Sequence, residues 1–404
     1  MFIGTLRCAA FLVLVYVIPS SAEGITEKEV LGRFLEQSPH ARELRARVAA
    51  TRAEFETRSL FPNPNFAYTR ESAGFTAFFE AQQTLPITGR LGHLRKAAVA
   101  GVGASEAESQ FALWTLRSDV RQAFFSLIRA QEREALLQKG IKEIDSVRKI
   151  LLAREKEGES SKFDRLRADR EAAELRAEQA IAQTLTVQAR SMLLAFLPKG
   201  SESFTATGSL TGPLTVAPAE LLERALRARG DYRAEESQIE RFQHEQTAAG
   251  RLRFPEPVVS AGLKRADTGR GGTASGAVVS LTLPLPLFNR GTTEVSRFRA
   301  EEDRARARRD TLQQQITAQV EGAYQTLFLR QRAAESYVSE LSSTNTELTK
   351  IAHIAYQEGE LGILELLDAH RVNRQSQLRL LDLRAAAKEA LIELERVVGE
   401  EIEK

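Results

Sequence analysis

Cysteine and methionine are scarce in this chain of 404 residues, and their scarcity excludes several kinds of chemistry. The one cysteine, Cys8, lies in the first apolar segment, so the rest of the chain has no disulfide, thiolate ligand or cysteine nucleophile. Beyond Met1 the only methionine is Met192, which excludes a methionine path for soft metals. The net charge of +2 is too small to indicate nucleic acid or an anionic surface as a partner.

Catalytic and metal-binding patterns are also missing. The five histidines have no i, i+4 partner and no cysteine nearby, so each is interpreted as a solvent or packing histidine. The glycine-rich stretch 269–272 follows a predicted strand but opens no helix, so it is not a phosphate-binding loop. We therefore expect no enzyme activity, no cofactor and no metal site. The histidines are His40, His93, His244, His353 and His370.

No apolar run reaches the 18 residues that a membrane-spanning helix needs. The longest lies near the N-terminus, where Arg7 precedes an apolar run over 8–18 and small residues follow. This predicts a signal peptide over residues 1–22, cleaved after Ala22, with a buried N-terminal helix as the alternative. Cys8 lies before the cleavage site, so no lipid anchor is predicted. An exported chain of this kind is either soluble or enters a membrane as β-strands.

Proline is rare and unevenly placed. Two long tracts, 87–197 and 287–404, contain none of the twelve prolines. The FPNP stretch at 61–64 matches FPEP at 254–257, and the LP pair at 85–86 matches another at 285–286. These near-constant offsets predict a tandem duplication. We expect a first repeat over 23–198, a Ser/Thr/Gly/Pro-rich linker over 199–218 and a second repeat over 219–404.

Each repeat should contain a helix, a strand hairpin and a long helical hairpin. The strand hairpins are expected at about 64–86 and 257–284, where apolar and polar residues alternate over roughly 10 residues. The helical hairpins are expected at about 90–197 and 291–398, with one interruption each at Gly158 and Gly359. Small residues at alternating spacings of three and four, such as Ala173, Ala177 and Ala180, predict helices packed side by side.

Four strands cannot close a barrel, and an open sheet edge in lipid leaves backbone groups without hydrogen bonds. Bacterial barrels begin at about eight strands. If the hairpins cross a membrane, several chains must therefore share one barrel. The alternative is a soluble periplasmic coiled-coil adaptor or scaffold, although adaptors have a single helical hairpin and this chain duplicates the whole unit.

Several motifs together resemble the TolC-like outer-membrane efflux proteins, and most of all their cobalt-zinc-cadmium branch. They are the FPNP stretch, LPLPLFNR at 283–290, L-x-A-x-R beyond each hairpin tip, and the pattern from Tyr356 through Gly359 to the LLDA stretch at 366–369. The resemblance implies a mainly α fold with β, in which four strands per chain contribute to a trimeric twelve-stranded transmembrane β-barrel. A periplasmic α-helical coiled-coil tunnel would continue this barrel.

The resemblance also implies a function. The chain would be the outer-membrane channel of a tripartite efflux system, with an equatorial-type segment in the linker. It would passively conduct heavy-metal cations or small toxic compounds from a periplasmic adaptor and an inner-membrane pump to the exterior. The sequence does not name the substrate.

Site residues follow from the same resemblance. The hairpin tips would contact the adaptor, and a periplasmic constriction would contain a gate tyrosine and two acids on one helix face. Three copies of these acids in a narrow pore would attract cations, and the alternative is that they are ordinary surface acids. Leu361 stands where TolC has a gate arginine. The tip residues are Gly158, Glu159, Ser160, Gly359, Glu360 and Leu361, and the constriction residues are Tyr356, Glu365 and Asp368.

Overall fold

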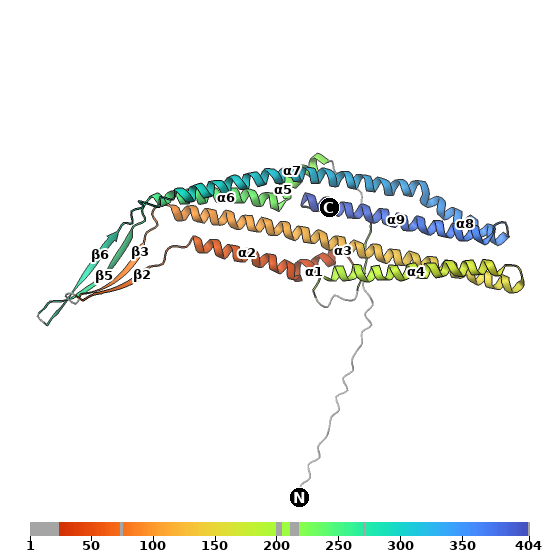
Figure 1. The fold of residues 1–404 in the computed structure, drawn as a ribbon, viewed down its shortest axis with the longest axis horizontal. Helices are drawn as coiled ribbons and strands as arrows, with labels where there is room; N and C mark the ends of the chain where they lie inside the picture. Colours follow the sequence, from red (N-terminus) through yellow and green to blue (C-terminus); the bar gives the residue numbers. More distant parts are fainter. Residues whose placement is uncertain (1–23, 73–75, 199–203, 211–217, 270, 403–404) are drawn as a thin grey trace, which may run out of the picture.

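The computed structural model describes residues 24–72, 76–198, 204–210, 218–269 and 271–402. It shows a long, thin molecule with a β-sheet at one end and the tips of helical hairpins at the other (Figure 1). The predicted fold class, mainly helical with two strand hairpins, is confirmed. The predicted signal peptide (1–22) and part of the predicted linker (199–218) lie outside the described residues.

The chain runs from the middle of the molecule to the sheet, back to a tip, and then repeats this path. The first passage contains β1 (Gly24–Ile25), α1 (Glu27–Gln37), α2 (Pro39–Arg58), β2 (Asn65–Glu71), β3 (Thr76–Thr84), α3 (Arg90–Glu157) and α4 (Lys162–Leu194). The second contains β4 (Thr205–Ala206), α5 (Pro218–Ala228), α6 (Gly230–Gly250), the 3-10 turn Arg251–Arg253, β5 (Val258–Asp267), β6 (Thr273–Thr282), α7 (Thr292–Tyr337), a π-helical turn (Val338–Ser342), α8 (Ser343–Glu358) and α9 (Ile363–Val398).

The second helical hairpin differs from the expectation of a single interruption. Its first limb is divided by the π-helical turn Val338–Ser342. This turn contains no glycine or proline from which it could have been predicted. The hydroxyl of Ser339 donates to the carbonyl oxygen of Ser336 at 3.0 Å. Serine side chains that bond to nearby carbonyls compete with the regular helical pattern. The apolar periodicity of the sequence gives no sign of this turn.

The sheet is antiparallel, in the order β2-β3-β5-β6, and its two faces differ. On one face Tyr68 lies opposite Phe79, and Phe79 lies opposite Leu263 on the next strand. The other face contains Glu80 and Lys264, and it also contains a hydrogen bond between the hydroxyls of Ser260 and Ser280. The apolar face is open to solvent, with exposed residues Phe66, Tyr68, Phe79, Leu263, Val279 and Leu281. Among the described residues, the outer edges of β2 and β6 pair with no other strand.

Helix α3 is the central element of the helical part, because it contacts α2, α4, α6 and α9 (Figure 1). Three apolar clusters lie along the molecule. One, in the middle, includes Phe34, Phe124 and Ile392; a second, toward the tips, includes Ile144, Leu175 and Leu366. The third joins α5, α7 and α9 around Leu221, Leu327 and Leu394. Burial of these side chains stabilises each contact by roughly 1.5–3 kcal/mol per residue.

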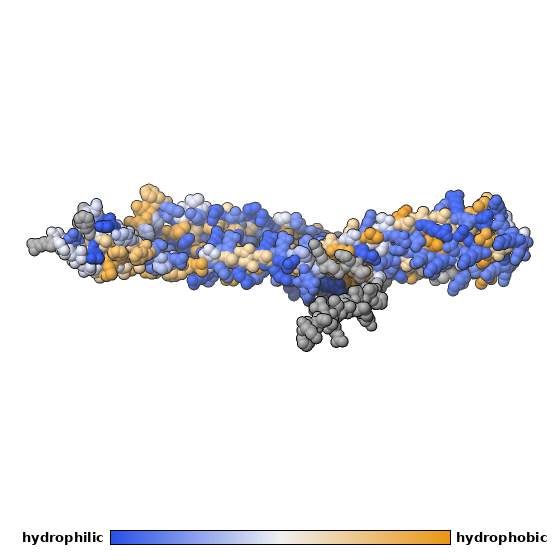
Figure 2. Space-filling view, turned by 90° about the horizontal axis from the view of Figure 1, so that it is seen from below, coloured by the Kyte–Doolittle hydropathy of each residue, from blue (hydrophilic) through white to orange (hydrophobic). Residues whose placement is uncertain are grey.

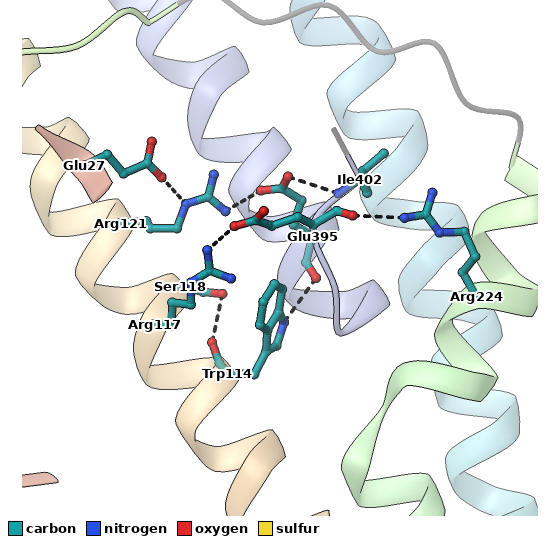
Figure 3. A network of polar contacts seen from close by, with 9 residues as sticks. Glu27, Trp114, Arg117, Ser118, Arg121, Arg224, Glu395 and Ile402 are labelled. Atoms are coloured by element: carbon teal, nitrogen blue, oxygen red, sulfur yellow. Dashed lines mark hydrogen bonds and ion pairs between the residues drawn. The ribbon is translucent and has the colours of Figure 1, made fainter. Parts of the chain in front are cut away.

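A buried polar network holds α1 and α9 against α3 in the middle of the molecule (Figure 3). The guanidinium of Arg121 donates to Glu27 in α1 and to Glu395 in α9, and both Arg121 and Glu395 are buried. The indole of Trp114 donates to the carbonyl oxygen of Glu395 at 3.2 Å. Loss of one partner of a buried ion pair typically costs about 3–5 kcal/mol. The network therefore fixes the bases of both helical hairpins to each other.

Helix α4 buries a different face from the one expected. Its buried side chains include Ala172, Leu175 and Ala182, which pack against α3. The predicted small-residue seam, with Ala173, Ala177 and Ala180, is exposed. The seam is therefore free of partners within the described chain, and exposed apolar residues lie close to it: Ile181, Leu185, Val187 and Met192.

None of the described helices combines the length and the apolar character needed to span a bilayer.

Candidate functional site: the tips of the helical hairpins

The first tip is a tight turn built on Gly158. The φ angle of Gly158 is 79°, and the amide of Glu159 donates to the carbonyl oxygen of Arg154 at 2.8 Å. This is a left-handed helix end, which glycine adopts without strain. Ser161 then caps α4 through a reciprocal pair of hydrogen bonds with Asp164. Gly158 and Glu159 are exposed and Ser160 is half-buried, so the turn presents its backbone to solvent.

The second tip repeats the turn but not the cap. Gly359 also has a φ angle of 79°, and the amide of Glu360 donates to the carbonyl oxygen of Ala355 at 2.9 Å. Gly359 and Glu360 are exposed, and Leu361 is half-buried. The next helix, α9, begins after Gly362 with no side chain capping its first amides. The two tips therefore share a backbone conformation. They differ in the start of the helix that follows, because α4 has a side-chain cap and α9 has none.

Tyr356 joins the two hairpins. Its side chain is only 7% exposed and belongs to the apolar cluster that also includes Leu151 of α3 and Leu366 of α9. The guanidinium carbon of Arg154 lies 5.2 Å from the centre of the Tyr356 ring. An arginine over an aromatic face stabilises such a contact by about 0.5–1 kcal/mol at partly exposed sites. The sequence did not single out Arg154, because nothing local shows that α3 and α8 meet here.

Glu365 and Asp368 are both exposed, but their surroundings differ. Asp368 forms an ion pair with Arg371 and lines a shallow groove between α4 and α9, next to Arg167 and Arg170. Glu365 forms no ion pair or side-chain hydrogen bond with any described residue. It lies in the first turn of α9, where the helix dipole favours a negative charge. Of the two acids, Glu365 is therefore the one that no described residue neutralises.

Two further contacts, which the sequence did not predict, connect α9 to the first hairpin. Nδ1 of His370 lies 3.5 Å from a carboxylate oxygen of Glu143 in α3. Arg374 is buried and donates to Glu171 in α4 at 2.9 Å. Its side chain passes over Gly140, where a Cβ atom would lie 3.2 Å from Cδ of Arg374. An isolated glycine inside a long helix was the one available signal for this close approach.

Electrostatics follow from these contacts. The interaction with His370 holds the pKa of Glu143 below its ordinary value. Hydrogen bonds from Arg148 lower the pKa values of Asp145 and Asp169, which lie between α3 and α4. The described residues contain no group of three or more His, Cys, Asp or Glu side chains suited to a metal ion. Among the described residues, the tips therefore combine exposed glycine turns with charged side chains and contain no such group.

The model of the family described as "Outer membrane efflux protein" matches residues 221–400. The cobalt-zinc-cadmium resistance protein CzcC of Cupriavidus metallidurans is 26% identical over 347 residues, which cover 84% of this chain and 82% of CzcC. Outer membrane protein OprJ of Pseudomonas aeruginosa is 27% identical over 350 residues, which cover 78% of this chain and 67% of OprJ.

Solved structures have the same fold. The Campylobacter jejuni outer membrane channel CmeC superimposes with a TM-score of 0.72 at 12% identity, covering 94% of this chain and 87% of CmeC. The resemblance predicted from the sequence motifs is thus confirmed by the family model and by the fold. Residues 221–400 of the chain match the outer membrane efflux protein family, and the whole chain is similar to CzcC and has the fold of CmeC.

Proposed function

We propose that the chain is the outer-membrane channel of a tripartite efflux system and serves as a passive conduit. The observation that supports this most strongly is the sheet, which has one exposed apolar face and two free edges. An apolar face suits lipid and a polar face suits a water-filled lumen. The same sheet argues against a soluble adaptor or scaffold, because a soluble protein would expose both the apolar face and the edges to aggregation.

The free edges of β2 and β6 require neighbours in a membrane, since each unpaired backbone group there costs several kcal/mol. We propose that three copies close a barrel of twelve strands, as the family resemblance implies. The helical part also offers complementary surfaces. The free face of α4 exposes Ile181 and Val187, and the free face of α8 exposes Leu348, Ile351 and Ile354. Packing these faces between copies would form the coiled-coil tunnel.

The tips are the proposed adaptor contact, through Gly158, Glu159 and Ser160 in the first hairpin and Gly359, Glu360 and Leu361 in the second. The exposure of both glycine turns supports this proposal, because their residues are accessible to a partner. An inner-membrane pump would deliver substrate through that adaptor.

The gate is proposed to consist of Tyr356, Glu365 and Asp368. Tyr356 would hold the second tip against the first through Arg154. Glu365 would provide most of the negative field of the pore, since Arg371 partly neutralises Asp368. Because the relative CzcC is a cobalt-zinc-cadmium resistance protein, we propose divalent metal cations as the substrate class.

The test is conductance of the purified full-length protein in planar bilayers, together with its mass in detergent. We expect a trimer whose pores prefer cations, and a marked loss of this preference in Glu365→Gln. Asp368→Asn is the matched control and should reduce the preference less. A monomer without conductance would overturn the proposed channel function. An unchanged selectivity in Glu365→Gln would overturn the proposal that this residue provides the negative field of the pore.

A further inference from the structure

The connections between sheet and helices share a pattern that the channel function does not explain. Each of the four carries an exposed apolar side chain with an arginine one to three residues away, on the helix side. The apolar residues are 43% to 101% exposed, and Phe288 is the most exposed of them. Figure 2 shows apolar surface gathered over the sheet and this junction. The pairs are Leu60 with Arg58, Ile87 with Arg90, Phe254 with Arg253, and Phe288 with Arg290.

The arginines of these four pairs are not held by acidic side chains. None of the four has a carboxylate oxygen within 4.0 Å among the described residues. Elsewhere in the molecule arginines such as Arg148, Arg165 and Arg229 form ion pairs. A cluster of unpaired arginines beside exposed apolar side chains favours a ligand that is both anionic and apolar.

A groove lies behind the connections, between the ends of α2, α3, α6 and α7. It has a volume of about 400 Å³ and is lined by Arg58, Arg90 and Arg297 together with Leu94 and other apolar side chains. Two acids, Glu245 and Glu294, also line it, and neither forms an ion pair with these arginines. One carboxylate oxygen of Glu294 is buried and has no hydrogen-bond partner. The groove therefore has three cations against two acids, an excess of positive charge, and one acceptor that lacks a donor.

We propose that this groove binds an acidic phospholipid of the periplasmic leaflet, with its phosphate on Arg58, Arg90 and Arg297. A headgroup hydroxyl, as in phosphatidylglycerol, would donate to Glu294. The acyl chains would lie along the exposed apolar residues of the connections and continue the apolar face of the sheet. This inference rests on the proposed function, since it needs the sheet to lie in the outer membrane.

Two features favour lipid over a soluble anion. First, α3 and α7 both begin at this groove after glycines that provide no side-chain cap, so their dipoles add to the attraction for phosphate. Second, side chains as exposed as Ile87 and Phe288 gain roughly 25 cal/mol per Å² of apolar area removed from water, and acyl chains can cover them. A free phosphate would use the arginines and leave these side chains in water.

The experiment measures phosphatidylglycerol binding by native mass spectrometry of the full-length protein released from nanodiscs of phosphatidylcholine and phosphatidylglycerol. We expect bound phosphatidylglycerol on the wild type. In the triple variant Arg58→Gln, Arg90→Gln, Arg297→Gln, the affinity for phosphatidylglycerol should fall by a factor of roughly ten or more. The matched control removes three exposed arginines that also lack an ion pair, through Arg33→Gln, Arg42→Gln and Arg332→Gln. It should bind as the wild type does.

Three outcomes would overturn the proposal: equal retention of both lipids by the wild type, equal loss in the two triple variants, or displacement of phosphatidylglycerol by inorganic phosphate. Conductance of the same samples separates this inference from the channel. A wild type that conducts but retains no phosphatidylglycerol disproves only the lipid site, whereas a wild type that does not conduct also removes the proposed function.

Discussion

The two helical hairpins have the same turn at their tips but are held together differently. In the first, Arg148 pairs with Asp169 at 2.6 Å and Arg165 pairs with Glu155 at 2.6 Å, so ion pairs link α3 to α4. In the second, no ion pair links α8 to α9 among the described residues, and the limbs meet mainly through apolar side chains. The π-helical turn Val338–Ser342 further interrupts the second hairpin.

From this difference we infer that the second hairpin is the more easily displaced. Ion pairs and a capped helix start resist opening of the first hairpin, whereas apolar contacts allow the second to slide at small cost. A π-helical turn is a common site of helix bending. We therefore expect the first hairpin to be the stiffer of the two, and the second to be the movable part of the proposed gate. Four predictions test this comparison.

The largest effect is expected from Leu366→Ala, which removes a fully buried side chain of the second hairpin. The cavity should lower the local free energy of opening at this tip by about 2–5 kcal/mol. Hydrogen exchange of amides in α8 and α9 measures it. Leu364→Ala is the control, because Leu364 is 55% exposed. Equal protection loss in both variants would show that the cluster does not hold the tip.

Acid should weaken the first hairpin more than the second. The pKa values of Asp145 and Asp169 are lowered from 3.8 by hydrogen bonds from Arg148. Their stabilisation is therefore present above pH 3.8 and is lost as the pH falls through the lowered folded values. Spin labels at Lys156 and Lys162 should show broadened distances below that pH. Labels at Gln357 and Leu364 should broaden less, and the reverse order would contradict the comparison.

A smaller effect is expected where the hairpins meet. Arg154→Met removes the cation over the Tyr356 ring and should weaken the contact by about 0.5–1 kcal/mol, which should raise the open fraction of the pore. Tyr356→Phe keeps the ring and should behave like the wild type. A double-mutant cycle with Tyr356→Leu measures the coupling between the two residues. Additive effects would mean that the arginine does not act through the ring.

The smallest effect on stability is expected from Arg371→Gln, because its ion pair with Asp368 is half-exposed on both sides. Thermal unfolding should change by less than about 0.5 kcal/mol. Freed from its partner, Asp368 should raise the cation preference of the pore, as measured by reversal potentials in a salt gradient. An unchanged selectivity would show that Asp368 lies away from the conducting path.

Much of the local structure could be predicted from sequence. The glycine turns occur at Gly158 and Gly359, where the sequence placed the interruptions. Both turns depend on the conformational freedom of one glycine, and a few residues of sequence are enough to identify it. The π-helical turn at Val338–Ser342 was not predicted, because the serine hydrogen bond that accompanies it leaves the spacing of apolar residues unbroken.

The candidate site was less accessible to sequence. Tyr356 and Glu365 came from a motif, but the long-range contacts of the site did not. Arg154 lies about 200 residues before Tyr356, and Glu171 lies about as far before Arg374. Contacts over such separations depend on which helices become neighbours, and no local pattern encodes that choice.

The sequence by itself determined the alternation of long helices and strand hairpins, because helix and strand periodicity and glycine turns act over a few residues. Only the tertiary structure decided which face of α4 is buried and which remains free, and which of the two acids is neutralised. The physical reason is that a helix with two apolar faces has no intrinsic preference between them until neighbouring helices bury one.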